Sequence, residues 1–399
     1  MRLFILLLSL CTVFSVNAQR NCSAAAYTAM PVISGQSNNI SPEKIITIPV
    51  VVHVVYNNTV ENISEAQIIS QINALNADFE KSNKDFSKVP SVFAKLAANT
   101  SIRFELAKTD PMGKATTGIV RKKSTRMMWT DDDKIKYLAN SGSTTWDARS
   151  YLNIWVCNTV PGLTGYATFP GAERAVDGIV VRYDAFGTMG KVSAPFNLGR
   201  TLTHEVGHWM GLKHLWGDQQ CGDDGIEDTP KQRSGNSGAP AFPKTTACNN
   251  TAEGEMFMNF MDFTNDASMG MFTAGQKMAM RVQFETSGKR NSLLNSKALA
   301  PAWNNNMEPE ILTVNPRDMV VYPNPGRGVV NLTGRLDDRM GMTSIVVTNL
   351  AGQVGARFEV EGLSGVFSQT LDLGHLAPGV YMITLQREDR SGVIRFIRE

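Results

Sequence analysis

The chain has 399 residues, of which 42% are hydrophobic and 19% are charged, and its formal net charge is +2. This length is sufficient for two domains with ordinary hydrophobic cores. Charge is nearly balanced and no dense run of Lys and Arg occurs, so the sequence indicates no nucleic-acid partner. Low-complexity segments and repeats of about 20–50 residues are absent, which argues against a repeat architecture.

Residues 1–18 have the pattern of a signal peptide. Met1 and Arg2 provide a positive start, residues 3–16 are almost continuously apolar, and Ala18 ends a small-residue cleavage site. A transmembrane anchor is the alternative, but the apolar run is shorter than the ~20 residues that a membrane span requires. We therefore expect an exported mature chain without a transmembrane segment.

Four cysteines remain after this signal peptide: Cys22, Cys157, Cys221 and Cys248. Export makes a disulfide possible, and Cys221 with Cys248 is the favoured pair because it closes a loop directly after the histidine-rich segment. The alternative is that these thiols stay free.

The chain continues with a small, polar segment at 19–43, which indicates a propeptide. The dense β-branched run IITIPVVVHVVY at 45–56 is typical of a strand buried on both faces. Ser64 is then a candidate N-cap for an amphipathic helix. Its apolar residues recur at helical spacing: Ile68, Ile72, Leu75 and Phe79.

Further strands are predicted at 102–106, 151–157 and 178–183. The histidine-rich motif follows on a helix that begins near Leu198. The stretch 222–243 is rich in Gly, Asp, Pro and Ser and predicts irregular loops, and a last helix is expected from about Thr273 to Phe284. The first domain, at 44–290, is therefore an α+β domain.

Residues 291–318 are interpreted as a linker. From 319 to 399, short alternating apolar runs are separated by turns of Gly, Asn and Asp. This pattern predicts a small all-β sandwich.

The segment HEVGHWMGLKH at 204–214 carries the chemistry. On a helix, His204 and His208 lie one turn apart on the same face, about 6 Å along the axis. Both imidazoles can therefore meet one zinc ion at ~2.0–2.1 Å. Glu205 is rotated by about 100° from His204, so it is placed to reach a metal-bound water rather than to act as a ligand.

A continuing helix would carry His214 ~15 Å beyond His204 along the axis. Gly211 allows the helix to end first, because glycine adopts the left-handed conformation without strain. The chain can then bring His214 back as a third ligand. Three histidines leave one position for water, which indicates a catalytic rather than a structural zinc site.

This extended motif resembles that of the metzincin clan of zinc peptidases. Residues 259–263, NFMDF, provide a candidate Met-turn with Met261. Together with IPVVVHVVY, YLNIWV and GYATFPG, they resemble the pappalysin family over roughly 44–290. The resemblance implies a metzincin domain with a mixed twisted sheet, a backing helix, an active-site helix, a Met-turn and a C-terminal helix.

The resemblance also implies an enzyme and assigns roles. His204, His208 and His214 match the zinc ligands and Glu205 matches the general base. Asp266 lies five residues after Met261, where family members carry an acidic residue in the primed-side specificity pocket. We therefore expect a zinc endopeptidase that cleaves proteins or peptides before Arg or Lys; a solvated loop carboxylate is the alternative for Asp266.

Two further sites are implied by the same resemblance. The family binds structural calcium where this chain has Asp223, Asp224, Asp228 and Thr229, and oxygen-rich loops suit that cation; a plain acidic turn is the alternative. Cys22 matches a propeptide cysteine that caps the zinc in some members. Its alternative is an incidental thiol.

One position departs from the family pattern. Phe263 stands where members often have a tyrosine close to the zinc, so a hydrogen bond from a phenol to the transition state is missing. This departure leaves room for a rival function, a surface adhesin with a vestigial protease domain. The intact ligands and base argue against it.

The C-terminal domain carries a second resemblance. It begins with Tyr-Pro-Asn-Pro at 322–325 and contains LAPGVYMITL and a terminal VIRFIRE, which resemble the sorting domain of type IX secretion. This implies the type IX machinery as a partner and a secreted or cell-surface location. An ordinary binding sandwich is the alternative.

Overall fold

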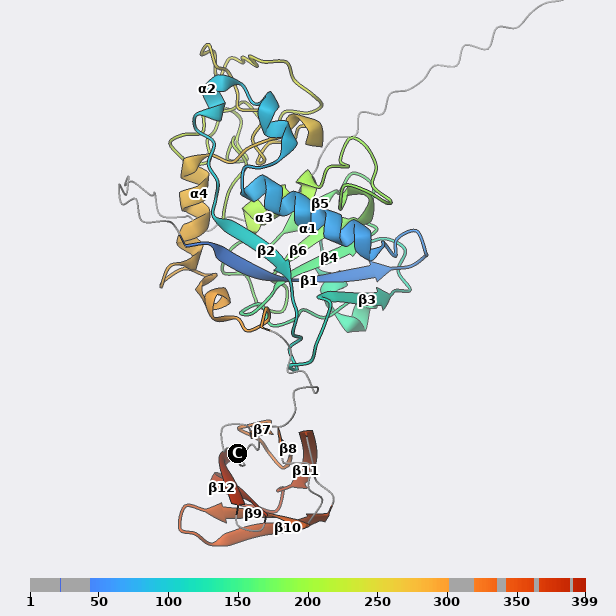
Figure 1. The fold of residues 1–399 in the computed structure, drawn as a ribbon, viewed down its shortest axis with the longest axis vertical. Coiled ribbons are helices and arrows are strands. Elements are labelled where there is room, and N and C mark those ends of the chain that lie inside the picture. Colours follow the sequence, from blue (N-terminus) through green and yellow to red (C-terminus); the bar gives the residue numbers. More distant parts are fainter. Residues whose placement is uncertain (1–21, 23–43, 301–318, 336–341, 362–365, 388–389) are drawn as a thin grey trace, which may run out of the picture. The chain divides into compact units, whose positions relative to one another are not determined.

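The computed structural model describes residue 22 and residues 44–300, 319–335, 342–361, 366–387 and 390–399 (Figure 1). The expected signal peptide, and the expected propeptide apart from Cys22, lie outside these residues. The chain divides into two compact units, one ending at Asn304 and one beginning at Asn305. Within the described segments, no helix has the length and hydropathy needed to cross a bilayer.

The first unit is built on a six-stranded mixed sheet with the strand order β2-β1-β4-β6-β5. The sixth strand, β3, pairs with the C-terminal half of β1, past the residues of β1 that pair with β2. The pairs within the sheet are parallel except that β5 runs antiparallel to β6. The strands are β1 (Ile46–Tyr56), β2 (Ile102–Leu106), β3 (Ile119–Lys123), β4 (Leu152–Cys157), β5 (Gly165–Ala167) and β6 (Ile179–Arg182).

β1 shows why this sheet forms. Successive side chains of a strand point to opposite faces. Val50, Val52 and Val54 enter the main core, whereas Val51 and Val55 enter smaller clusters. The sheet is thus covered on both sides, as the uninterrupted β-branched run predicts.

In the described part of the first unit, four α-helices accompany the sheet: α1 (Glu65–Phe79), α2 (Ser91–Ala94), α3 (Arg200–Trp209) and α4 (Ala274–Arg281). The hydroxyl of Ser64 accepts from the backbone N–H of Gln67, so the predicted N-cap of α1 is confirmed. α4 begins with a capping box at Thr273 and continues into the 3₁₀ helix η6 (Val282–Phe284). The last helix therefore covers the expected segment.

Between residues 44 and 300, the structure has six more 3₁₀ helices that the sequence pattern did not indicate: η1 (Lys84–Lys88), η2 (Lys134–Lys136), η3 (Leu138–Asn140), η4 (Tyr183–Ala185), η5 (Asp266–Ser268) and η7 (Asn291–Asn295). η7 falls where the linker was expected to begin. Leu293 and Ala298 are buried there, and the Ala298 carbonyl accepts from Lys108 and Thr109. Residues 291–300 thus pack on the first unit.

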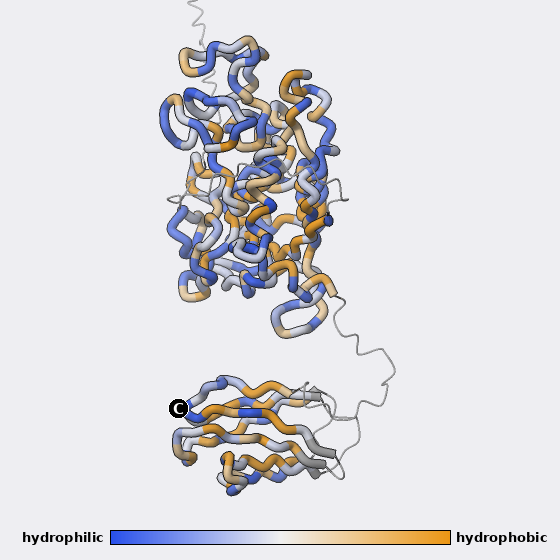
Figure 2. Tube along the Cα trace, turned by 90° about the vertical axis from the view of Figure 1, so that its left-hand side faces the viewer, coloured by the Kyte–Doolittle hydropathy of each residue, from blue (hydrophilic) through white to orange (hydrophobic). Residues whose placement is uncertain are grey.

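The second unit consists of two antiparallel sheets, with the orders β10-β9-β12-β13 and β11-β8-β7. Hydrophobic and hydrophilic residues alternate along its strands (Figure 2), and the inward side chains form a separate core around Leu332, Val347 and Leu385. The strands are β7 (Val320–Tyr322), β8 (Val329–Arg335), β9 (Met342–Asn349), β10 (Val354–Glu361), β11 (Val366–Asp372), β12 (Gly379–Arg387) and β13 (Arg390–Arg398).

Candidate metal centre

α3 carries the first two histidines of the motif. It starts after Gly199, whose φ of 82° is left-handed, and all ten of its residues are buried. His204 and His208 lie one turn apart on this helix, at 0% and 1% exposure. The helix was expected to begin near Leu198 and begins at Arg200.

The end of α3 brings the third histidine back. Gly211 has a φ of 95°, and its N–H donates to the His208 carbonyl. After this turn, His214 lies buried with its Nε2 3.0 Å from Nε2 of His208, which is itself 3.1 Å from Nε2 of His204. The three imidazoles therefore converge as the motif predicts.

The other ring nitrogen of each histidine is occupied. Nδ1 of His204 lies 2.7 Å from the carbonyl oxygen of Phe260, and Nδ1 of His208 lies 2.8 Å from that of Leu212. A carbonyl oxygen can only accept, so each Nδ1 carries the proton. Burial lowers the pKa of His208 to about 3, which keeps its imidazole neutral. A neutral ring with a protonated Nδ1 presents a bare Nε2, the form that binds a metal.

Met261 lies directly beneath this helix. A Cβ built on Gly207 would come within 2.4 Å of the Met261 sulfur, so the contact requires glycine at that position. The Met261 N–H donates to the side chain of Asn259, and Asp262 N–H donates to the Asn259 carbonyl, which closes a turn. The same turn delivers the Phe260 carbonyl to His204.

Glu205 follows His204 on α3 and is linked to the histidine cluster through Cys22. It is fully buried, and it lies against β5, since a Cβ on Gly165 would meet its Oε1 at 3.1 Å. The thiol of Cys22 donates to Glu205 Oε2 at 3.1 Å. Cys22 also joins the three histidines in one group whose ligand atoms all lie within 4.8 Å of one another. The structure thus brings together the residues predicted for the zinc site, including Cys22.

Asp266 belongs to η5, and its side chain contacts the N-terminal end of α3. Its Oδ2 accepts from the backbone N–H groups of Leu198 at 2.7 Å and Arg200 at 3.3 Å. The side chain is fully buried, so a merely solvated loop carboxylate does not describe it. Close by, burial raises the pKa of Asp78 to about 7, partly opposed by the positive charge of Arg200.

The residues predicted to bind calcium are not gathered in the same way. Asp224 accepts from Ile226 N–H and Thr229 Oγ1, while Asp228 accepts from Thr273 and Gly275 at the start of α4. Asp223 is exposed, with Lys231 3.9 Å away. Among the residues that the structure describes, the only cluster of three or more His, Cys, Asp or Glu ligands is the one around His204.

The expected disulfide between Cys221 and Cys248 is present. Cys157 and Cys22 are buried free thiols. The Phe263 ring stands roughly perpendicular to the His214 ring, with centroids 4.7 Å apart, and Trp216 stacks on the same imidazole at 4.6 Å; the Phe263 and Trp216 rings also contact each other, with centroids 4.9 Å apart. Phe263, at the position where the family often has tyrosine, therefore packs against the His214 ring.

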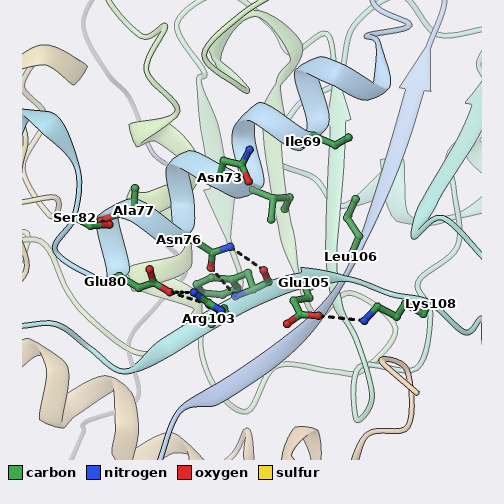
Figure 3. Close-up of a pocket in the computed structure, with 12 residues that line it drawn as sticks. Ile69, Asn73, Asn76, Ala77, Glu80, Ser82, Arg103, Glu105, Leu106 and Lys108 are labelled. Carbon is green, nitrogen blue, oxygen red and sulfur yellow. Dashed lines mark hydrogen bonds and ion pairs between the residues drawn. The ribbon is translucent and has the colours of Figure 1, made fainter. Parts of the chain in front are cut away.

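A surface groove of about 550 Å³ lies at the opposite edge of the sheet, between α1 and β2 (Figure 3). Its polar groups satisfy one another: Arg103 pairs with Glu80, Lys108 with Glu105, and the Asn76 amide exchanges hydrogen bonds with the backbone of Phe104. The side chains that converge on a reactive centre are at the β5 edge instead.

The sequence pattern did not predict several groups that contact the histidines or α3. The carbonyls of Phe260 and Leu212 are backbone groups, so residue type gives no indication of their contacts with His204 and His208. Arg290 closes the other end of α3: its guanidinium donates to the Trp209 carbonyl, lies 4.0 Å from the Trp209 ring and pairs with Asp177. Asp218 follows His214 within an irregular loop, where no periodic spacing points to the pairing.

Comparison with known proteins agrees with this geometry. The model of the peptidase M43 family, described as pregnancy-associated plasma protein-A, matches residues 136–285, and that of a secretion system C-terminal sorting domain matches residues 320–399. An extracellular metalloprotease of Verticillium alfalfae is 32% identical over 256 residues, which are 61% of this chain and 78% of the relative. A Podospora anserina extracellular metalloprotease is 32% identical over 53% of this chain and 67% of its own length.

Solved structures similar to this chain include two forms of one enzyme. Mature mirolysin of Tannerella forsythia in complex with a cleaved peptide is 48% identical with a TM-score of 0.64, covering 65% of this chain and all of that chain (100%). A promirolysin mutant of the same organism is 48% identical with a TM-score of 0.63, covering 64% and 85%. The fold around the histidine cluster is therefore that of a metzincin-like protease, and the chain belongs to the peptidase M43 family as a secreted or cell-surface metalloendopeptidase with a C-terminal type IX sorting domain.

Proposed function

We propose that this metalloendopeptidase is a zinc enzyme that cleaves peptide bonds before Arg or Lys, with Glu205 as its general base. The observation that carries the proposal is the convergence of three histidine Nε2 atoms beside a buried glutamate. The adhesin alternative is not favoured, because the ligand set and the base are both intact.

The donor set fits zinc. Two nitrogens that each bind zinc at ~2.1 Å in a tetrahedron are about 3.4 Å apart. The Nε2 separations of 3.0 Å and 3.1 Å along His204, His208 and His214 are close to that value. Three imidazole ligands and an open fourth position are the composition of a catalytic zinc site.

When bound, zinc lowers the pKa of a coordinated water and polarises the substrate carbonyl. Glu205 would accept the proton of the attacking water at Oε2 and then deliver it to the leaving amine. Its burial against Gly165 keeps the carboxylate in a fixed orientation. Met261 is proposed as the Met-turn residue, and it packs against α3 at Gly207. Phe263 has no hydroxyl, so it supplies no hydrogen bond to the developing oxyanion.

The preference for basic residues rests on Asp266. A buried carboxylate at the N-terminal end of the active-site helix is the partner that a substrate Arg or Lys side chain requires. Asp266 is tied to the helix that carries His204, which fixes it relative to the proposed zinc ligands.

A peptide-library digest tests both parts of the proposal. The zinc-loaded enzyme should release fragments that begin with Arg or Lys, and a chelator should stop the cleavage until zinc is restored. Asp266→Asn should reduce the preference for Arg or Lys by about 10–100-fold, since a charge-assisted hydrogen bond contributes ~1.5–3 kcal/mol. Asparagine retains an oxygen that can accept from Leu198 and Arg200, so the fold should persist.

Cleavage by the wild-type enzyme without enrichment of Arg or Lys after the scissile bond would refute the specificity. Full activity in the presence of the chelator, with the metal shown to be removed, would refute the zinc mechanism.

A further inference from the structure

The three histidines differ in what holds their Nδ1 atoms. His204 and His208 use the backbone carbonyls of Phe260 and Leu212. His214 instead has its Nδ1 2.5 Å from Oδ1 of Asp218. The Nδ1 partner of His214 is thus a carboxylate, and it belongs to a side chain that substitution can remove.

The loop after His214 is shaped to deliver this carboxylate. Gly217 N–H donates to the His214 carbonyl, and Gly217 and Asp218 both have left-handed backbones, with φ of 55° and 59°. A side chain at Gly217 would not fit, because its Cβ would lie 2.2 Å from the Asp223 carbonyl oxygen. Aspartate is one of the few residues other than glycine that often adopts this conformation.

The loop is also fixed at its far end. Cys221 follows three residues later, forms the disulfide to Cys248, and donates its N–H to the Arg233 carbonyl. Trp216, within the same loop, stacks on the His214 ring with an interplanar angle of 3°. Two contacts from one short loop therefore set the orientation of His214.

A carboxylate that accepts from Nδ1 fixes the tautomer with a bare Nε2, as a carbonyl does. In addition, its negative charge makes that Nε2 a better electron donor to a metal. The side chain of Asp218 is 35% exposed and that of His214 is 2% exposed, so the charge acts on a buried ring while one side of the carboxylate meets solvent.

We propose that Asp218 is a positioning residue that makes His214 a strong zinc ligand and thereby sets the affinity of the centre for the metal. The inference rests on the proposed zinc site. Partners of this kind commonly change metal affinity by about 10–100-fold when they are removed. His204 and His208 keep their backbone carbonyls in every variant, so the loss is confined to one ligand.

The test is a titration of the full-length protein with zinc against a chromophoric chelator. Asp218→Asn keeps an oxygen acceptor but loses the charge, and Asp218→Ala loses both. We expect the dissociation constant for zinc to rise by about tenfold in Asp218→Asn and by up to about 100-fold in Asp218→Ala. Cobalt-substituted protein should report the same order, because its visible absorption follows the coordination of the metal.

Asp147→Asn is the matched control. Asp147 is paired with Arg149 and has a side-chain exposure of 36%, close to that of Asp218, but it is outside the metal cluster. The dissociation constant of the Asp147→Asn variant for zinc should equal that of the wild type. The metal-free proteins should have equal melting temperatures, and zinc should raise the melting temperature less in the Asp218 variants.

Failure of the two proposals can be told apart. Wild-type protein that binds no zinc contradicts the proposed function. Wild-type protein that binds zinc, with Asp218→Asn and Asp218→Ala binding equally well, contradicts the role of Asp218 alone. A lowered melting temperature of the metal-free Asp218 variants with an unchanged zinc affinity assigns the residue to the fold and likewise overturns the inference.

Discussion

The first unit contains two segments whose residue types predict a metal site, the histidine-rich segment 204–214 and the acidic segment 223–229. The structure arranges their side chains differently. In the segment 204–214, three histidines converge and their second nitrogens are all occupied. In the segment 223–229, Asp224 and Asp228 serve separate turns, and Asp223 faces solvent near Lys231.

The difference lies in how each ligand set is held. A helix fixes the spacing of His204 and His208 before any tertiary contact forms, and one glycine turn adds His214. The carboxylates at 223–229 lie on an irregular loop, where hydrogen bonds to backbone N–H groups compete for the same oxygens. Residue type alone therefore predicts a metal centre better on a regular element than on a loop.

The largest effect should come from Glu205. Replacing it with Ala or Gln should reduce the rate of peptide cleavage by about 10²–10⁴-fold, because Glu205 is the carboxylate that we propose carries the proton. Turnover measured on protein with a known zinc content makes the comparison, and zinc binding and the melting temperature should stay close to wild type. Substantial residual turnover in the zinc-loaded variant would remove the proposed mechanism.

A smaller effect is expected from Cys22. Its thiol lies on Glu205 and among the histidines, so we propose that it holds the precursor inactive. Cys22→Ala should raise the activity of the precursor by about tenfold or more, since a hydrogen bond to a charged group contributes ~1.5–3 kcal/mol. Activity of freshly purified precursor is the measurement.

Cys157→Ala is the control for that experiment. Cys157 is also a buried free thiol, but it lies in β4 within a hydrophobic cluster, and burial raises its pKa. Freshly purified precursors of both variants with the same activity as the wild-type precursor would leave Cys22 without a switch function.

The smallest effect concerns the acidic loop. If calcium binds at Asp224 and Asp228, an excess of ~100 times its dissociation constant stabilises the fold by about 2.7 kcal/mol. For a domain of this size that is a rise of about 5–10 °C in melting temperature. Asp224→Asn should reduce the rise, and magnesium should produce less of it. An unchanged melting temperature of the wild type in calcium would contradict the calcium prediction. The segment 204–214 would then be the one of the two that keeps a predicted metal site.

Local patterns determined much of the molecule. The β-branched run of β1, the Ser64 cap of α1 and the capping box at Thr273 act between residues that are close in sequence. The strands β3 and β5 were not predicted, because β5 has only three residues and its burial follows from its neighbour β6. Short strands take their stability from the sheet rather than from their own sequence.

The motif at 204–214 shows the same boundary at the level of the site. Helical spacing and the turn at Gly211 are local, so the sequence alone determined that three histidines could meet. Only the tertiary structure decided what surrounds them: Met261 under Gly207, the Phe260 carbonyl on His204, and Cys22, 183 residues away in sequence, on Glu205. Periodicity records short-range geometry, whereas contacts across long loops depend on the packing of the whole core, which no local pattern encodes.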